Sequence, residues 1–186
     1  MEKTWGIVLG HVRLTGGKMI VRIFTSQRGT VAFIVHGTYS RASSHRNAAL
    51  MPLNIVEIDY EHRQTRELQT FREVQLLGQY VSLPYHPLKQ TMALFLGEFL
   101  MYALRHEGEN RELLRYLTTA MVRLDEAEES FTSFHLDVMR RVADFLGYGS
   151  DILQSMTLSQ LVEYYRAHVP EFPELKSLPI LHEVLH

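Results

Sequence analysis

The sequence predicts a mixed chain in which a β-rich part precedes an all-α part. Up to Leu77, short apolar runs alternate with polar residues at a period of two and are separated by turn residues, which is typical of β-strands. After Pro84-Tyr85-His86-Pro87 the apolar period changes to about 3.6, which is typical of amphipathic helices. We therefore expect one domain in residues 1–80 and a helical domain in residues 81–186.

Five β-strands are expected in the first domain. In chain order they are Thr4–Leu14, Lys18–Thr25, a strand with Val31, Phe33 and Val35 on one face, a strand with Val56, Ile58 and Tyr60 on one face, and Glu67–Leu77, which could also run into a helix. Turns at residues 15–17 and 27–29 join the first three strands as hairpins. Five short strands with a long polar connection after the third favour a small barrel of the OB type, and an SH3-like barrel stays open.

Apolar stripes at spacings of three and four predict the helices of the second domain. The stripes are Leu88, Met92, Phe95, Phe99 and Ala103, then Leu113, Leu117, Met121 and Leu124, then Phe131, Phe134, Val138, Val142 and Phe145. The third helix should end at Gly147-Tyr148-Gly149. Thr157 and Gln160 form a capping box for a fourth helix, and Pro173 should open a last short one.

Composition and charge exclude several kinds of protein. No stretch approaches the roughly 18 consecutive apolar residues of a membrane span, so we expect a cytoplasmic protein without a membrane partner. The chain has no cysteine, which excludes disulfides, thiolate zinc sites and thiol catalysis. Residues 1–50 carry seven Lys and Arg against one Glu, whereas the rest is acidic. Such an excess is expected of a domain that binds a polyanion, although chance clustering on a solvated surface is the alternative.

Several short motifs, in order and spacing along nearly the whole chain, resemble the bacterial RecO recombination mediators. They are Gly6-Ile7-Val8-Leu9, Phe24-Thr25 followed by Gly29, His36-Gly37 followed by Arg41, Leu50 with Pro52, Leu68 and Glu73, Phe145-Leu146-Gly147-Tyr148, and Phe172-Pro173-Glu174-Leu175-Lys176-Ser177-Leu178. The last motif resembles members from Bacteroides-like bacteria.

The resemblance implies a non-enzymatic DNA repair mediator without a cofactor. It implies an N-terminal OB-fold, a helical remainder, and binding and annealing of single-stranded DNA. The implied partners are RecR, single-stranded DNA-binding protein and, indirectly, RecA, which the mediator helps to load onto coated DNA.

Three features depart from the family pattern. His36 stands where relatives usually have Lys, which weakens one phosphate contact. The four-cysteine zinc site of many relatives cannot form in this chain. Residues 149–156 are shorter than the corresponding stretch of the family, so that either this is a short member or a segment is missing there.

Binding of single strands requires cations that follow the backbone and flat side chains on which bases stack. The DNA-binding candidates are Arg13, Lys18, Arg22, Arg28, Arg41, His45 and Arg46 for phosphates and Tyr39 for stacking. Trp5, Phe24 and Phe33 lie within apolar alternation and are expected in the core instead.

The helical domain is expected to bind the acidic C-terminal tail of single-stranded DNA-binding protein, which ends in an aromatic residue and a free carboxylate. The candidate cations are Arg105, Arg111, Arg115, Arg123, Arg140 and Arg141, flanked by Leu104, Leu114, Met121 and Met139. The alternative is that these arginines only solvate helix faces or pair with neighbours such as Glu112 and Asp137.

Two other functions stay open. Glu57, Asp59 and Glu61 share one strand face and, with the histidines, suggest a metal-dependent nuclease or phosphohydrolase, but no catalytic Lys lies nearby and a solvated strand face explains them better. His182 and His186 have the i, i+4 spacing of metal ligands without the adjacent Glu of a metalloprotease, so no metal site is expected. A purely protein-binding OB module would lack salt-sensitive affinity for DNA.

Overall fold

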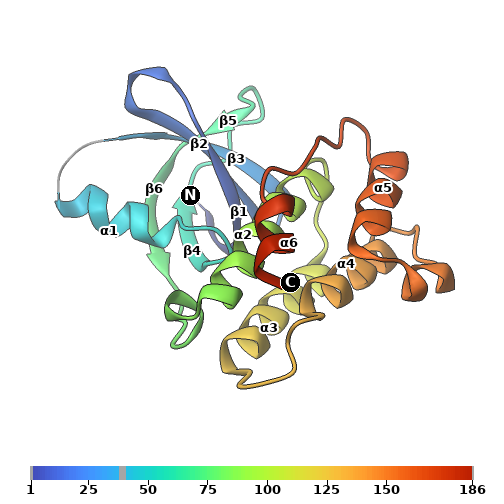
Figure 1. Ribbon diagram of the computed structural model, residues 1–186. Helices are drawn as coiled ribbons and strands as arrows, with labels where there is room; N and C mark the ends of the chain where they lie inside the picture. The colour runs from blue at the N-terminus through green and yellow to red at the C-terminus, as the bar shows by residue number, and fades with distance from the viewer. Residues whose placement is uncertain (1, 38–40, 186) are drawn as a thin grey trace. The chain divides into compact units, whose positions relative to one another are not determined.

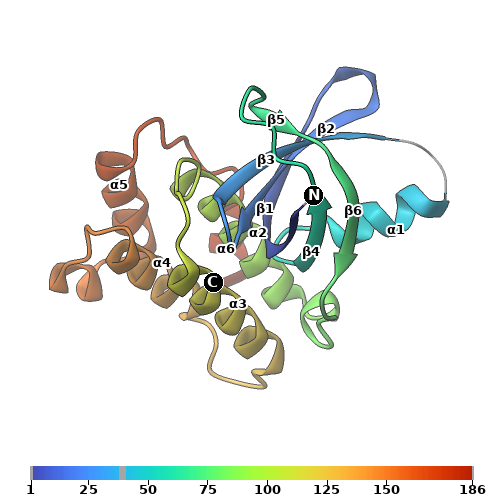
Figure 2. The same ribbon diagram turned by 180° about the vertical axis from the view of Figure 1, so that it is seen from behind.

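The computed structural model describes residues 2–37 and 41–185, and for residues 41–43 it describes the backbone alone. The chain forms two compact units, which are drawn in Figures 1 and 2. Unit 1 contains Met1–Gln79 and Leu104–Thr118, and unit 2 contains Tyr80–Ala103 and Thr119–His186. The first passage between the units lies next to the boundary expected at residue 80, but unit 1 also includes residues that the sequence assigned to the helical part.

Unit 1 is built on a curled six-stranded sheet (Figure 1). Its strands are β1 (Glu2–Arg13), β2 (Lys18–Thr25), β3 (Gly29–His36), β4 (Ile55–Tyr60), β5 (Leu68–Gln69) and β6 (Phe71–Leu76), in the spatial order β5-β3-β2-β1-β4-β6. The two end strands, β5 and β6, are separated in the chain by Thr70 alone, so that the sheet curls back on itself. The single strand predicted over Glu67–Leu77 is thus divided into β5 and β6. Because β5 pairs parallel with β3 and β6 pairs antiparallel with β4, this stretch of chain joins the two ends of the sheet. The expected OB-type architecture is confirmed.

The core of this barrel follows from the alternation along its strands. Val21 and Ile23 of β2 face Phe33 of β3 and Ile58 of β4, and all four are buried. Phe33 meets Tyr60 edge to face, with ring centroids 5.1 Å apart, which is a favourable aromatic geometry. The predicted core residues Phe24 and Phe33 are fully buried, whereas Trp5 is only partly covered.

The connection between β3 and β4, expected to be a polar loop, contains helix α1 (Arg41–Ala49). Alanines favour a helix there, but no apolar stripe marks it. The C-terminal end of α1 reaches the core through Ala49 and the following Leu50. The Asn54 amide donates to the carbonyls of Ala48 and Ala49 and thereby satisfies the last turn of α1. Tyr39 and the side chain of Arg41 lie outside the described residues.

Unit 2 is helical, as expected. Its helices are α2 (Pro87–Ala103), the second half of α3 (Arg111–Glu126), α4 (Phe134–Phe145), α5 (Leu158–His168) and α6 (Leu178–Leu185), with short 3₁₀ turns at Leu83–Tyr85 and Asp151–Ser155. The capping box of Thr157 and Gln160 is confirmed at the start of α5. Gly147 follows α4 with a φ of 86°, which is the helix stop that the sequence predicted.

The last helix begins later than predicted. The prediction that Pro173 opens it is wrong, because α6 starts at Leu178. The carboxylate of Glu98 on α2 accepts hydrogen bonds from the backbone N–H groups of Lys176 and Ser177, at 2.9 and 2.8 Å, and from the Ser177 hydroxyl. An acceptor from a distant helix therefore sets the start of α6. Among the described residues, no helix has the length and apolar character required to cross a membrane.

Candidate nucleic-acid interface

A cavity of about 650 Å³ lies on unit 1, over the outward face of β2 and β3 and beside the loop of residues 61–67. Its ionisable lining consists of Arg22, Arg28, Arg66, Arg105, Glu67, Glu109, His62 and His106. Arg22 of β2 stands opposite Ala32 of β3, whose small side chain leaves the space above the sheet open. Four arginines against two glutamates make the cavity an electropositive site.

A single buried amide holds the loop of residues 61–67 against the cavity. Gln69 of β5 is 2% exposed, and its carbonyl oxygen accepts the N–H of Arg63 at 2.9 Å. Its amide nitrogen donates to the backbone carbonyls of Arg63 and Arg66, at 3.0 and 2.5 Å. Because the pairing of β5 with β3 places Gln69 opposite Phe33, closure of the barrel also positions Arg66 at the cavity.

Arg28, at the turn between β2 and β3, forms a two-pronged ion pair with Glu2 at the start of β1. Its Nη2 and Nε atoms lie 2.7 and 3.1 Å from the two carboxylate oxygens. The hydrogen bond from Arg28 lowers the pKa of Glu2, and the same bond raises the pKa of Arg28. Both side chains are more than a third exposed, so solvent screens the pair and part of the Arg28 charge remains available to an anion.

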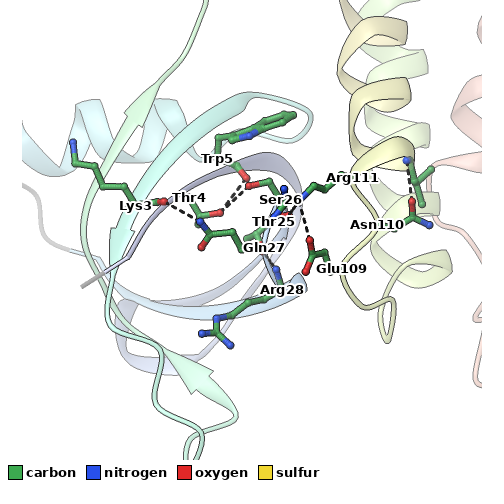
Figure 3. A network of polar contacts seen from close by, with 11 residues as sticks. Lys3, Thr4, Trp5, Thr25, Ser26, Gln27, Arg28, Glu109, Asn110 and Arg111 are labelled. Atoms are coloured by element: carbon green, nitrogen blue, oxygen red, sulfur yellow. Dashed lines mark hydrogen bonds and ion pairs between the residues drawn. The ribbon is translucent and has the colours of Figure 1, made fainter.

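Figure 3 shows how polar contacts join the start of α3 to this end of the barrel. Ser26 bonds the backbone of β1 through its N–H, which donates to the Trp5 carbonyl at 2.9 Å, and its hydroxyl lies 3.1 Å from that of Thr4. Arg111 of α3 donates to the Ser26 carbonyl at 3.2 Å and pairs with Glu109 at 2.8 Å. Arg111 therefore fastens α3 to the barrel in unit 1.

The predicted DNA-binding cations fall into two groups. Arg22 and Arg28 line the cavity described above. Arg13 and Lys18 lie at the opposite end of the β1–β2 hairpin, where Lys18 pairs with His36 in the sheet. Arg46 donates to the His36 carbonyl at 2.8 Å and, with His45, lines a second cavity of about 600 Å³ beside β6. The second cavity also contains Arg72, which the sequence did not single out.

The predicted tail-binding arginines are divided between the units. Arg105, Arg111 and Arg115 belong to unit 1, and Arg123, Arg140 and Arg141 belong to unit 2. Arg140 is the most constrained. It donates to the carbonyls of Leu153 and Met156 at 2.9 and 3.3 Å and pairs with Asp137 at 3.2 Å.

Arg141 is also engaged within unit 2: it pairs with Asp144 at 3.4 Å and lies 4.9 Å above the Phe145 ring. Arg115 and Arg123, by contrast, are exposed on α3.

The acidic face of β4 alternates with the core as predicted, with Val56, Ile58 and Tyr60 buried and Glu57 and Asp59 on the other side. Glu57 pairs with Lys3 at 3.4 Å, and Glu61 pairs with Arg63 at 3.5 Å. Across the described residues, three His, Cys, Asp or Glu side chains nowhere gather closely enough to hold a metal ion.

Comparison with known proteins decides the family. Residues 1–80 match the family described as Recombination protein O N terminal. The chain is 30% identical over 238 residues to the DNA repair protein RecO of Phocaeicola vulgatus, with 99% of each chain covered. The chain belongs to the RecO family. It is also 29% identical over 239 residues to RecO of Bacteroides fragilis, again with 99% of each covered. Its role is therefore that of a DNA repair protein.

The RecO relatives are longer than this chain. The alignment with the Phocaeicola protein runs over 238 residues, whereas the chain has 186, so the relative contains residues without a counterpart here. RecO of Flavobacterium johnsoniae aligns over 151 residues, which cover 81% of this chain and 63% of that protein. The shortening expected at residues 149–156 stays a prediction, because the alignment lengths do not place the difference.

Several residues of the main cavity were not predicted from the sequence. Arg66 and His62 follow the acidic strand β4, where the local charge is not basic, and Thr30 and Gln69 act through backbone contacts that only the folded sheet creates. The polar run between the fourth and fifth predicted strands was the one available signal, since loops beside an OB barrel are common ligand-binding sites.

Proposed function

We propose that unit 1 binds single-stranded DNA through its basic surface and that the protein acts as a recombination mediator. The observation that carries this proposal is the arginine-lined cavity over β2 and β3, since OB-folds bind oligonucleotides on this face and on the neighbouring loops. The second group of cations, at the other end of the hairpin, would extend the path of the strand. Strand annealing, cooperation with RecR and loading of RecA onto coated DNA complete the proposed activity.

The binding should be electrostatic and tolerant of sequence. We expect the affinity for single strands to fall steeply with salt, because each phosphate contact releases counterions. Reversal of Arg41 and Arg46 to Glu should weaken binding to all single strands about equally, as measured by fluorescence anisotropy. A second pair, Arg13→Glu with Lys18→Glu, keeps the test independent of the Arg46 hydrogen bond to β3.

The control is Arg166→Glu, which makes one charge reversal of the same kind on α5 of unit 2. Folding of every variant is checked by its thermal midpoint. Unchanged affinity in both barrel pairs would sink the assignment of the second group of cations, at the other end of the hairpin from the cavity. Degradation of the strand in added Mg²⁺ or Mn²⁺, abolished by Asp59→Asn, would instead favour the nuclease hypothesis.

We also propose that exposed arginines of α3 bind the acidic tail of single-stranded DNA-binding protein. Arg115 and Arg123 are the sharpest probes, because Arg111 already bonds the Ser26 carbonyl. Alanine at Arg111, Arg115 or Arg123 should weaken binding of a tail peptide about tenfold in at least one case, since an arginine clamp on a carboxylate forms paired hydrogen bonds. If all three variants bind the peptide like the parent, the tail site lies elsewhere.

A further inference from the structure

The segment of residues 104–109, between α2 and α3, is fastened directly to the first residues of β3. The Thr30 N–H donates to the Glu107 carbonyl at 3.0 Å, and the Thr30 hydroxyl donates to the Leu104 carbonyl at 2.5 Å. Gly29 has a φ of 69°, and a Cβ atom on it would lie 2.2 Å from the Glu107 oxygen. Both the backbone conformation and the close approach therefore require glycine at this position.

This attachment brings new side chains to the cavity. Arg105 and His106 line it together with Arg22 of β2 and Arg66 of the β4–β5 loop. Three pieces of chain that are remote in sequence thus present cations to one concave site within unit 1. The apolar residues of the lining are Val31 and Ala32, so that the cavity offers no large apolar slot for an aromatic side chain.

We propose that residues 104–109 complete a phosphate pocket, in which Arg105 joins Arg22 and Arg66 on a backbone phosphodiester of a single strand. The inference rests on the proposed function of unit 1 and assigns Arg105 to DNA rather than to the tail peptide. Thr30 is a positioning residue, because it touches the segment rather than the phosphate. A phosphate suits the site better than an acidic tail does, since the tail also needs an apolar slot.

The test measures anisotropy of a labelled oligothymidine with the full chain over a range of salt concentrations. Arg105→Gln should weaken binding roughly threefold and reduce the slope of log affinity against log salt by about 0.7, the value for one phosphate contact on a single strand. Thr30→Val removes a hydroxyl but no charge, and it should weaken binding in the same direction. Arg166→Gln is the matched control, since it makes the same substitution on α5 of unit 2, outside the cavity lining.

The outcomes separate this proposal from the function on which it rests. If Arg105→Gln keeps the parental affinity and slope while Arg13→Glu with Lys18→Glu lowers both, the pocket is wrong and the barrel still binds DNA. If the parent itself shows no salt-sensitive affinity, both proposals fall. Equal loss with 5′-hydroxyl and 5′-phosphate oligonucleotides supports a backbone phosphate, whereas loss only with the 5′-phosphate overturns that assignment in favour of a strand end. Loss of tail-peptide affinity without loss of DNA affinity also overturns it.

Discussion

The two units use charged side chains in opposite ways. In unit 1, Arg22, Arg28 and Arg66 line an open cavity. In unit 2, Lys89 and Asp125 are buried and bond to neighbouring chain segments. The difference indicates that these two buried groups hold the chain together in unit 2, whereas the cavity of unit 1 presents arginines at the surface. Substitution of the buried groups of unit 2 should therefore change stability, and substitution of the cavity arginines of unit 1 should change binding.

Asp125 should give the largest effect on stability. Its carboxylate accepts the N–H groups of Val81, Ser82 and Leu83 at 2.8, 2.8 and 2.6 Å, and Lys89 donates to its carbonyl at 2.8 Å. Asp125→Ala removes the acceptor of these three N–H groups and the carboxylate charge beside the buried Lys89 ammonium, which keeps its bond to the backbone carbonyl. We therefore expect a loss of about 3–5 kcal/mol in the free energy of unfolding. Urea denaturation measures it.

The control for Asp125 is Asp144→Ala, which removes an exposed partner of Arg141 and should cost under about 1 kcal/mol. Burial alone would raise the pKa of Asp125, but the three backbone hydrogen bonds and Lys89 outweigh it and lower that pKa. The stabilisation is therefore complete above the ordinary carboxyl pKa and is lost as the pH falls through the folded-state value. Equal losses in the two variants would contradict the contrast between the units.

His135 should make unit 2 sensitive to acid. It is 2% exposed, and its ring packs edge to face on Phe95. Burial lowers its pKa to about 4 from the ordinary 6.5, against a smaller opposing effect of Asp137. The unfolded chain therefore takes up a proton that the folded chain excludes, and stability falls as the pH drops from 6.5 toward 4.

The expected loss from His135 is roughly 3 kcal/mol by pH 4. His135→Phe removes this titration, so the difference in stability between pH 6.5 and 4 should shrink by about that amount when both proteins are unfolded in urea. The phenylalanine ring is larger than the histidine ring and could pack badly. His135→Gln therefore serves as a second variant that also lacks a titrating group. A pH dependence that is the same in all three proteins would show that the pKa of His135 does not differ between the folded and unfolded chains.

Much of the fold could be predicted because it follows from local patterns. β2 begins and ends where the alternation placed it, and the capping box at Thr157 needs only two residues three positions apart. α1 could not be found in this way, because its nine residues show no apolar stripe. The start of α6 depends on Glu98, which lies some eighty positions earlier in the chain.

The residues of the candidate site likewise fall into those that a local pattern predicts and those that it does not. A charge count found Arg22 and Arg28, because the excess of cations in residues 1–50 is a property of composition. It could not find Arg66 or Arg105, since each lies in a stretch with acidic neighbours. They reach the cavity because β5 closes the barrel and because Thr30 bonds the segment after α2. Prediction from sequence therefore succeeds where a segment carries a pattern of its own and fails for the contacts between segments.

The Arg28–Glu2 pair should give the smallest effect on stability. It tests most directly the contrast between the buried charged groups of unit 2 and the exposed ones of unit 1. Both side chains are over a third exposed, so neutralising either should change the free energy of unfolding by less than about 1 kcal/mol despite the two-pronged geometry. Binding should respond in opposite directions. Arg28→Gln removes a cation from the cavity and should weaken the affinity for single strands roughly threefold, whereas Glu2→Gln removes the competing anion and should strengthen it. If Glu2→Gln weakens binding, or if either variant unfolds as easily as Asp125→Ala, the pair is structural and unit 1 uses this charge as unit 2 does.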